Sequence, residues 1–237
     1  MPGTLYLLPA ALGEVSWTSY LPTATRETAC RLRHFIVENA KTARAELKRL
    51  EHPTPLREIA IEQLPEKLSP ADIDRLVAPL MAGEDIGLMS EAGCPAVADP
   101  GALLVRRAHQ LGVTVKPMVG PSSLLLALMA SGLEGQRFAF HGYLPAREPE
   151  RGRRVTQLEQ ESGRLGQTQI FIETPYRNAV LFQALITACR PPTRLCLAID
   201  LTLPSEAVLT KSIAEWRQSP TPALDKRPTV FLLLGAC

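Results

Sequence analysis

The stretch GLMSEAGCPAVADPG, residues 87–101, decides the fold class of this chain. A short apolar strand ends at Ser90, and a loop punctuated by glycine and proline follows it. Asp99 and Pro100 then predict a helix start, because aspartate is a favourable N-cap and proline is tolerated in the first helical turn. Open α/β sheets bind their ligands at the carboxyl ends of the strands. The stretch therefore predicts an α/β sheet with a small-ligand site directly after this strand.

Short apolar strands alternate with amphipathic helices on both sides of this stretch. Strands are predicted over residues 4–8, 35–37, 58–61, 86–89 and 113–116, and helices over 23–33, 39–50, 71–81 and 101–111. This β-α-β-α order favours a parallel sheet joined by right-handed crossovers. The strands are brief and rich in leucine or β-branched residues, as is typical of strands covered on both faces. We expect an N-terminal α/β domain with a parallel sheet over residues 1–118.

The pattern changes after residue 120, where the predicted strands are spaced more widely. Helices are predicted over 122–131, 147–164, 175–189 and 211–217, and strands over 138–140, 169–172, 195–199 and 229–234. The looser spacing favours a mixed sheet rather than a parallel one. We place a domain boundary within residues 116–120 and expect a second α/β domain over residues 119–237.

Composition narrows the class of protein further. The chain has 237 residues, of which 46% are apolar and 21% are charged, as in globular proteins. Its formal net charge of +2 gives no strong global attraction to nucleic acid or to an anionic membrane, although a local basic patch is compatible with it. The amino terminus lacks a signal-type pattern, and the longest apolar run is shorter than the about 20 residues that a membrane helix needs. We expect no membrane association.

Cysteine and histidine usage argues against two further classes of site. None of the five cysteines forms a C-x-x-C pair, which favours reduced thiols in a cytoplasmic protein. The four histidines are scattered and form no cluster with cysteine, so we expect no metal site. No G-x-G-x-x-G follows a strand and no G-x-x-x-x-G-K-[ST] occurs, so ordinary dinucleotide and Walker-type phosphate sites are poorly supported.

Four ordered motifs in the centre of the chain resemble a known family. They are SEAGCP with DPG at 90–101, VGPSS at 119–123, SGL at 131–133 and FHGYLP at 140–145. These resemble the tetrapyrrole-methylase-type S-adenosylmethionine methyltransferases. They are most similar to the branch that methylates a ribose 2′-hydroxyl in small-subunit ribosomal RNA, where the pattern reads S-D-A-G-T-P-x-x-x-D-P-G, P-G-P-S-A, S-G-L and F-x-G-[FY]-L-P.

The resemblance extends more faintly to both ends. LPAALG at 8–13 resembles the first-strand loop, and ETPYR at 173–177 resembles E-S-P-H-R. Two segments depart from the ribosomal branch: ENAK at 38–41 stands for E-D-T-R, and IDLTL at 199–203 stands for R-E-L-T-K. The departures change charged positions, so we expect an acceptor that differs from the branch's usual nucleotide.

The resemblance implies that S-adenosylmethionine lies in a cleft between two α/β domains. The cofactor-binding residues that it implies are Pro9, Ser90, Glu91, Gly93, Cys94, Gly120, Ser122, Ser123, Thr174, Leu201 and Thr229. Gly93 and Gly120 let the backbone approach a ligand closely, although turn chemistry explains either glycine equally well when taken alone. Free N–H groups at the helix start near Ser122 can hold a carboxylate or a ribose oxygen, whereas Ser122 or Ser123 alone is more often an N-cap.

Methyl transfer needs alignment of donor and acceptor and, for a hydroxyl or amine acceptor, a proton acceptor. Glu38 and Glu173 are the candidate catalytic bases, although a solvated or salt-bridged carboxylate is the favoured interpretation of each. Arg177 follows Glu173 by four residues and either pairs with it or contacts a phosphate. Together with Lys41 and Arg44, it is a candidate substrate-binding residue.

Two other segments allow either a purely structural or a functional interpretation. Arg147, Arg151, Arg153 and Arg154 form the densest basic run, interrupted by glutamates, and a mobile solvated loop is favoured over an RNA contact. The apolar stripe 124–129 is assigned to the core or to a dimer face.

The sequence therefore predicts a two-domain, S-adenosylmethionine-dependent methyltransferase, cytoplasmic and homodimeric as the family is, with RNA as the expected acceptor. A tetrapyrrole or another small molecule is the alternative acceptor. A protein that binds the cofactor without catalysis and serves a regulatory role is the alternative class.

Overall fold

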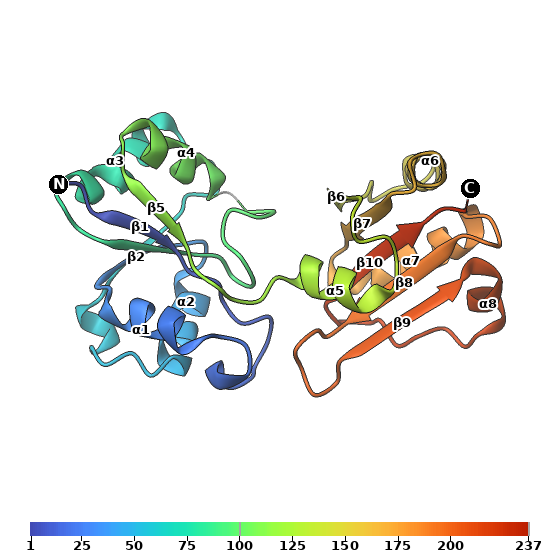
Figure 1. Cartoon of the computed structure of the whole chain (residues 1–237), viewed down its shortest axis with the longest axis horizontal. Helices are drawn as coiled ribbons and strands as arrows, with labels where there is room; N and C mark the ends of the chain where they lie inside the picture. Colours follow the sequence, from blue (N-terminus) through green and yellow to red (C-terminus); the bar gives the residue numbers. More distant parts are fainter. Residues whose placement is uncertain (100, 237) are drawn as a thin grey trace. The chain divides into compact units, whose positions relative to one another are not determined.

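The computed structural model describes residues 1–99 and 101–236 and divides into two units, Met1–Ser122 and Ser123–Cys237 (Figure 1). Each unit has its own five-stranded sheet and its own apolar core. The two-domain α/β fold that the sequence predicts is therefore confirmed.

The sheet of the first unit is parallel throughout and has the strand order β3-β2-β4-β1-β5. Its strands are β1 (Thr4–Leu7), β2 (His34–Val37), β3 (Ala60–Gln63), β4 (Ile86–Met89) and β5 (Thr114–Pro117). β2 and β4 are buried along their whole length, because helices cover both faces of the sheet. β1 lies between β4 and β5, so the loops that follow these three strands leave the same edge side by side.

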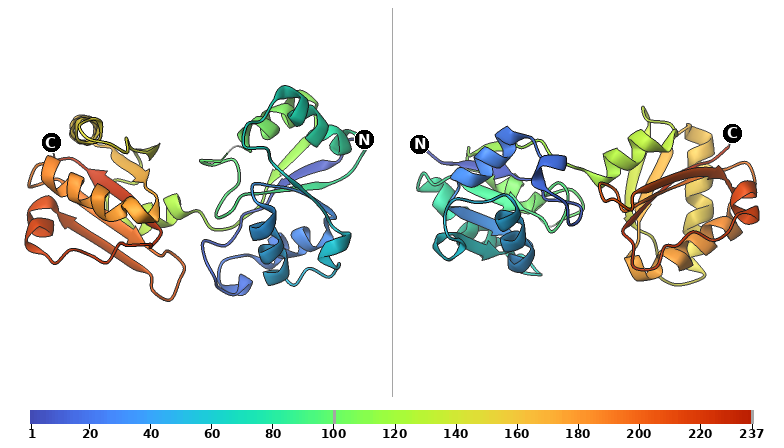
Figure 2. Two further views of the ribbon diagram at one scale, coloured as in Figure 1. Left: turned by 180° about the vertical axis from the view of Figure 1, so that it is seen from behind. Right: turned by 90° about the horizontal axis from the view of Figure 1, so that it is seen from below.

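Alternate side chains of each strand supply two separate cores. Phe35 and Val37 of β2 pack with α1 (Thr23–Arg31) and α2 (Ala40–Arg49), and Ile36 packs with α3 (Pro70–Met81) and α4 (Ala102–Gln110). Figures 1 and 2 show these helix pairs on opposite faces of the sheet. Two short 3-10 helices, η1 (Trp17–Ser19) and η2 (Leu56–Glu58), complete the unit, and Arg26 stacks over the ring of Trp17.

The start of α4 differs from the sequence-based prediction. The N-cap is Gly101, without a side-chain cap, and the Ser90 hydroxyl that follows β4 donates to the Ala92 carbonyl within the loop. The prediction that Asp99 caps this helix is therefore wrong. The prediction for Pro100 lies outside the described residues.

The sheet of the second unit is mixed, as predicted, with the order β6-β7-β10-β8-β9. Its strands are β6 (Phe138–Tyr143), β7 (Thr168–Ile172), β8 (Arg194–Ile199), β9 (Ala207–Ser212) and β10 (Thr229–Leu234). Only the β6–β7 pair is parallel. β9 was not predicted, because its sequence AVLTKS places polar residues on a half-exposed edge strand and lacks a continuous apolar run.

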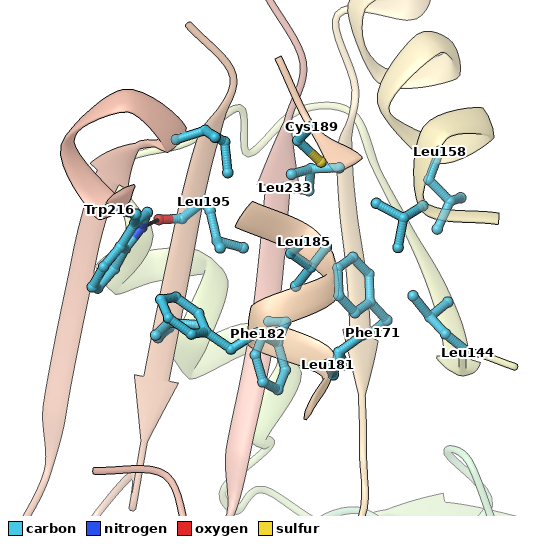
Figure 3. Close-up of a cluster of buried hydrophobic side chains, with 14 of the residues drawn as sticks. Leu144, Leu158, Phe171, Leu181, Phe182, Leu185, Cys189, Leu195, Trp216 and Leu233 are labelled. Atoms are coloured by element: carbon cyan, nitrogen blue, oxygen red, sulfur yellow. Dashed lines mark hydrogen bonds between the residues drawn. The ribbon is translucent and has the colours of Figure 1, made fainter. Parts of the chain in front are cut away.

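Helices cover both faces of this second sheet. α6 (Glu150–Leu165), α7 (Asn178–Ala188, preceded by η3, Pro175–Arg177) and α8 (Ile213–Gln218) enclose the main core, and α5 (Ser123–Ser131) packs on β8, β9 and β10. Figure 3 shows Phe171, Phe182 and Trp216 in that core, where the Trp216 indole donates to the Leu195 carbonyl over 2.9 Å. No helix within the described ranges is long and apolar enough to cross a membrane.

Candidate functional site

The loops that follow β1, β4 and β5 are bound to one another at the carboxyl edge of the first sheet. Ala10 and Gly93 exchange two backbone hydrogen bonds, of 2.9 and 3.1 Å, which join the β1 loop to the β4 loop. The Cys94 thiol donates to the Pro121 carbonyl over 3.4 Å and joins the β4 loop to the β5 loop. The motifs SEAGCP and VGPSS and the loop LPAALG are therefore joined at one edge of the first sheet.

Gly93 and Gly120 are required for different reasons. Gly93 has a φ of +72°, a left-handed conformation, and a Cβ added there would meet no atom closer than 3.5 Å. A Cβ added at Gly120 would instead lie 2.5 Å from the Cβ of Pro9. Packing within the protein thus accounts for Gly120, whereas the left-handed backbone conformation accounts for Gly93, where an added Cβ would make only ordinary contacts with Leu12 and Pro121.

Three carboxyl groups gather where β2 and β4 end. Glu38 follows β2, and its Oε2 accepts a hydrogen bond from the Glu91 backbone N–H over 3.1 Å. Burial, followed by the nearby charges of Glu38 and Glu91, raises the pKa of Asp99 to about 6, although the Ser90 hydroxyl acts in the opposite direction. The sequence indicated Ser90 and Glu91 but missed Asp99, because its position before proline favoured a capping role.

The helix α2 begins at this same edge. Asn39 caps it, since its Oδ1 accepts from the backbone N–H groups of Lys41 and Thr42. The candidate substrate-binding residues Lys41 and Arg44 lie in its first turns and are exposed. They are therefore available to a ligand that approaches the strand ends.

A buried carboxylate that the sequence did not indicate ties α2 to the β1 loop. Glu46 is 3% exposed, and its Oε1 accepts from the Ala11 backbone N–H over 3.3 Å and from the Tyr20 hydroxyl. Arg49 pairs with its other oxygen. Burial, together with the hydrogen bond to Glu46, raises the pKa of Tyr20. Only the fold distinguishes this glutamate from an ordinary solvated one.

In the second unit, the other candidate residues lie at one edge of the sheet, where β7 and β8 end and β10 begins, while Ser123 is the first residue of α5. The buried Glu173 accepts from the Thr174 backbone N–H over 2.6 Å and from Arg177 over 2.7 Å, so it is salt-bridged. Leu201 and Thr229 are both buried at this edge.

An ion pair shapes the loop after β8. Asp200 accepts from Arg227 over 2.8 Å and from the Ser205 hydroxyl over 2.7 Å. Asp200 and Thr202 have positive φ angles of 49° and 71°. Residues other than glycine seldom adopt this conformation, which is common at ligand-binding loops.

Three buried polar atoms at this edge lack a hydrogen-bond partner. They are Arg177 Nε, Asn178 Oδ1 and Thr202 Oγ1, and no other buried side-chain atom of the described chain is in this state. Asn178 is fully buried, and its Nδ2 donates to the Arg227 carbonyl over 2.7 Å. An unsatisfied buried polar group costs about 1–3 kcal/mol, so these atoms favour a polar ligand or water at this edge.

The arginine run does not form the mobile solvated loop that the sequence favoured. α6 begins at Glu150, and Arg151 is buried, pairs with Glu148 over 2.9 Å and donates to the Ala146 carbonyl. The helix forms because those contacts anchor its first turn. Among all the described residues, no group of three or more His, Cys, Asp or Glu side chains is placed to hold a metal ion.

Comparison with known proteins decides the family, although no protein-family model matches the chain. The ribosomal RNA small subunit methyltransferase I of Pseudomonas aeruginosa is 32% identical over 216 residues, which cover 90% of this chain and 71% of that protein. This chain belongs to the ribosomal RNA small subunit methyltransferase I family. The namesake from Xylella fastidiosa strain Temecula1 is 36% identical over 161 residues, 68% of this chain and 58% of that protein. This chain spans little more than half of the length of that relative.

Solved structures support the same fold. The methyltransferase CobJ has a TM-score of 0.64 at 14% identity, covering 100% of this chain and 95% of that one. The uroporphyrin-III-C-methyltransferase from Thermus thermophilus has a TM-score of 0.56 at 17% identity, covering 99% and 93%. The predicted tetrapyrrole-methylase-type resemblance is therefore confirmed, and with it the ribosomal RNA branch.

Proposed function

We propose that this protein is an S-adenosylmethionine-dependent methyltransferase whose acceptor is RNA of the small ribosomal subunit. The observation that carries the proposal is the joining of three strand-end loops, which brings together two of the family's central motifs, SEAGCP and VGPSS. Family membership supports RNA over a tetrapyrrole, because the curated relatives are ribosomal RNA methyltransferases. The tetrapyrrole enzymes resemble this chain in fold alone.

The residues present fit the proposed cofactor. The first unit offers Pro9, Ser90, Glu91, Gly93, Cys94, Gly120 and Ser122 at its strand-end loops, and the second offers Ser123, Thr174, Leu201 and Thr229. Gly93 carries no side chain on the β4 loop, which allows close backbone approach. The unpartnered Arg177 Nε, Asn178 Oδ1 and Thr202 Oγ1 supply one donor, one acceptor and a hydroxyl that can be either. A nucleoside with several polar groups matches such a set.

The protein's part in the chemistry is positioning and proton removal. S-adenosylmethionine supplies a methyl group on an already activated sulfonium. The strand-end loops would hold the cofactor and the acceptor in alignment when both are bound. Of the two candidate bases, Glu173 already accepts two hydrogen bonds on one oxygen. Glu38 is half-buried and accepts a single hydrogen bond, from the Glu91 backbone N–H. We therefore propose Glu38 as the general base that removes the proton of the acceptor hydroxyl.

Cofactor binding is the first test. Calorimetry with S-adenosylmethionine or its demethylated product is expected to give micromolar affinity, about 8 kcal/mol. No heat and no thermal shift at millimolar ligand would overturn the proposal.

The acceptor is tested with labelled cofactor and a cell extract that either has or has not been depleted by ribonuclease. We expect label transfer that ribonuclease abolishes. Transfer that survives ribonuclease would indicate a small-molecule acceptor, and binding without any transfer would indicate a regulatory protein. We expect the labelled nucleotide to differ from the family's usual one, because residues 38–41 and 199–203 depart from the pattern. Restoration of the usual ribose methylation in a strain that lacks it would show those departures to be neutral.

We also propose that the protein acts in the cytoplasm and as a homodimer. The thiols of Cys30, Cys94, Cys189 and Cys196 are all unpaired, in keeping with a reducing compartment. The apolar outer face of α5, with Leu125 and Met129 exposed, supports self-association.

A further inference from the structure

The solvent face of α2 carries three exposed cations and no anion. Lys41, Arg44 and Lys48 are three and four residues apart, which places them on one face of the helix over about 10 Å. The helix's only carboxylate, Glu46, is buried and paired with Arg49. Within the described residues, none of the three cations lies within ion-pair distance of a carboxylate. The positive charge of this face is therefore uncompensated.

The arginine run at the start of α6 is different, although it holds more cations. Arg151 is buried against Glu148, and Arg153 pairs with Glu150 over 3.3 Å. Arg154 donates to the Nδ1 of His141 over 3.2 Å. These three arginines already have partners within the protein. The denser basic run in the sequence is therefore the weaker candidate for binding an anionic polymer.

The position of α2 links its basic face to the strand-end loops. The helix starts two residues after Glu38, whose carboxylate accepts a hydrogen bond from the Glu91 backbone N–H of the β4 loop. One turn from its end, Glu46 receives the N–H of Ala11 from the β1 loop. Two hydrogen bonds thus fix α2 to both loops, and a polyanion held on its face lies beside the edge that we propose as the reaction site.

We propose that the face of α2 formed by Lys41, Arg44 and Lys48 binds the phosphate backbone of the acceptor RNA. This inference rests on the proposed function, since it takes RNA as the acceptor. Three side chains that neutralise phosphates release condensed counterions, so the affinity must fall with salt in proportion to the number of contacts. Backbone contacts of this kind position the RNA without reading its sequence.

The test compares three proteins that bind end-labelled, protein-free small-subunit ribosomal RNA between about 50 and about 200 mM salt. The first is the unmodified chain. The second carries Lys41→Ser, Arg44→Ser and Lys48→Ser. The matched control carries Arg31→Ser, Arg33→Ser and Arg57→Ser, which removes three exposed cations that precede β2 and β3, at the amino edge of the same sheet. S-adenosylmethionine affinity is measured in all three.

We expect the α2 variant to lose RNA affinity about tenfold or more and its log–log salt slope to shrink by about 2, with unchanged cofactor affinity. The control variant is expected to lose far less. Equal losses in both variants, or RNA binding that survives in the α2 variant, would overturn the inference while the proposed function stands. RNA binding absent from the unmodified chain would overturn both. Cofactor binding absent from it would overturn the proposed function and leave the α2 face as an RNA-binding surface without an acceptor role.

Discussion

At the scale of single residues, Gly93 is the position where backbone conformation controls the proposed site. Gly93→Ala places a side chain at a φ of +72°, which costs about 1–2 kcal/mol although the added methyl meets no close neighbour. We expect the strain to displace the backbone pair with Ala10 and to weaken S-adenosylmethionine binding, measured by calorimetry beside thermal unfolding.

Gly112 is the matched control for this substitution. It has a φ of +70°, nothing lies within 4 Å of its added Cβ, and it precedes β5 at the opposite edge of the sheet. Gly112→Ala should lose the same stability and keep full cofactor affinity. Equal affinity losses in the two variants would show that the β4 loop is not the cofactor loop.

Asp99 gives a pH-dependent prediction. Its pKa rises from 3.8 to about 6 on folding, so the folded state holds the proton more tightly than the unfolded one. The stability that this proton contributes is present below the unfolded pKa and is lost as the pH rises through about 6. Asp99→Asn should therefore remove this loss, so that the variant gains stability over the unmodified chain when urea unfolding is moved from about pH 4 to about pH 7.

Asp72 provides the control of opposite sign. Hydrogen bonds from Ser69 lower the pKa of Asp72, so its stabilisation is present above the ordinary carboxyl pKa and is lost on acidification. Asp72→Asn should lose stability at neutral pH relative to acid. A difference of the same sign for both variants would contradict the assignment of the raised pKa to Asp99.

At the scale of elements, Glu46 makes α2 and the β1 loop one unit. Glu46→Ala removes the acceptor for Ala11 N–H and for Tyr20, and we expect a loss of about 2 kcal/mol in unfolding free energy together with weaker cofactor binding. Glu46→Gln keeps an acceptor oxygen and should restore much of the cofactor affinity.

Substitution of Glu159 is the control that distinguishes a positioning role of Glu46 from a general contribution to stability. It is an equally buried carboxylate that accepts from the Arg190 backbone N–H over 2.7 Å and from the Thr193 hydroxyl, before β8 begins. Glu159→Ala should destabilise the protein without changing cofactor affinity. If Glu46→Ala behaves in the same way, its role is structural only.

The elements were more predictable from the sequence than the site was. The bounds of β4 and β10 agree with the prediction, because both are unbroken apolar runs. β9 was not predicted, because an edge strand needs only a weak apolar pattern. Glu46 and Asn178 were not predicted as site residues, because no local sequence pattern distinguishes a buried polar side chain from an exposed one. Contacts with residues distant in the sequence bury both side chains. The strand-end loops were predictable, because glycine, proline and serine at fixed spacing favour particular local backbone conformations.

At the scale of the whole molecule, self-association is the feature to test. Leu125 is 52% exposed and Met129 is 80% exposed, one turn apart on α5. Leu125→Glu with Met129→Glu should convert a dimer into a monomer, measured by light scattering, with each unit still folded. Phe138→Glu, on the edge strand β6, is an exposed apolar control that should leave the mass unchanged. A monomeric unmodified chain would contradict the proposed homodimer.

The two tryptophans give each unit its own optical reporter. Trp17 is the fluorophore of the first unit, partly exposed beneath the Arg26 guanidinium, and Trp216 is that of the second, enclosed in its core. Emission from Trp216 should therefore lie at shorter wavelength and shift red when its unit melts. Trp17→Phe and Trp216→Phe would each leave a single emitter, so that the order in which the halves unfold, and the half that a ligand protects, can be recorded in a cuvette.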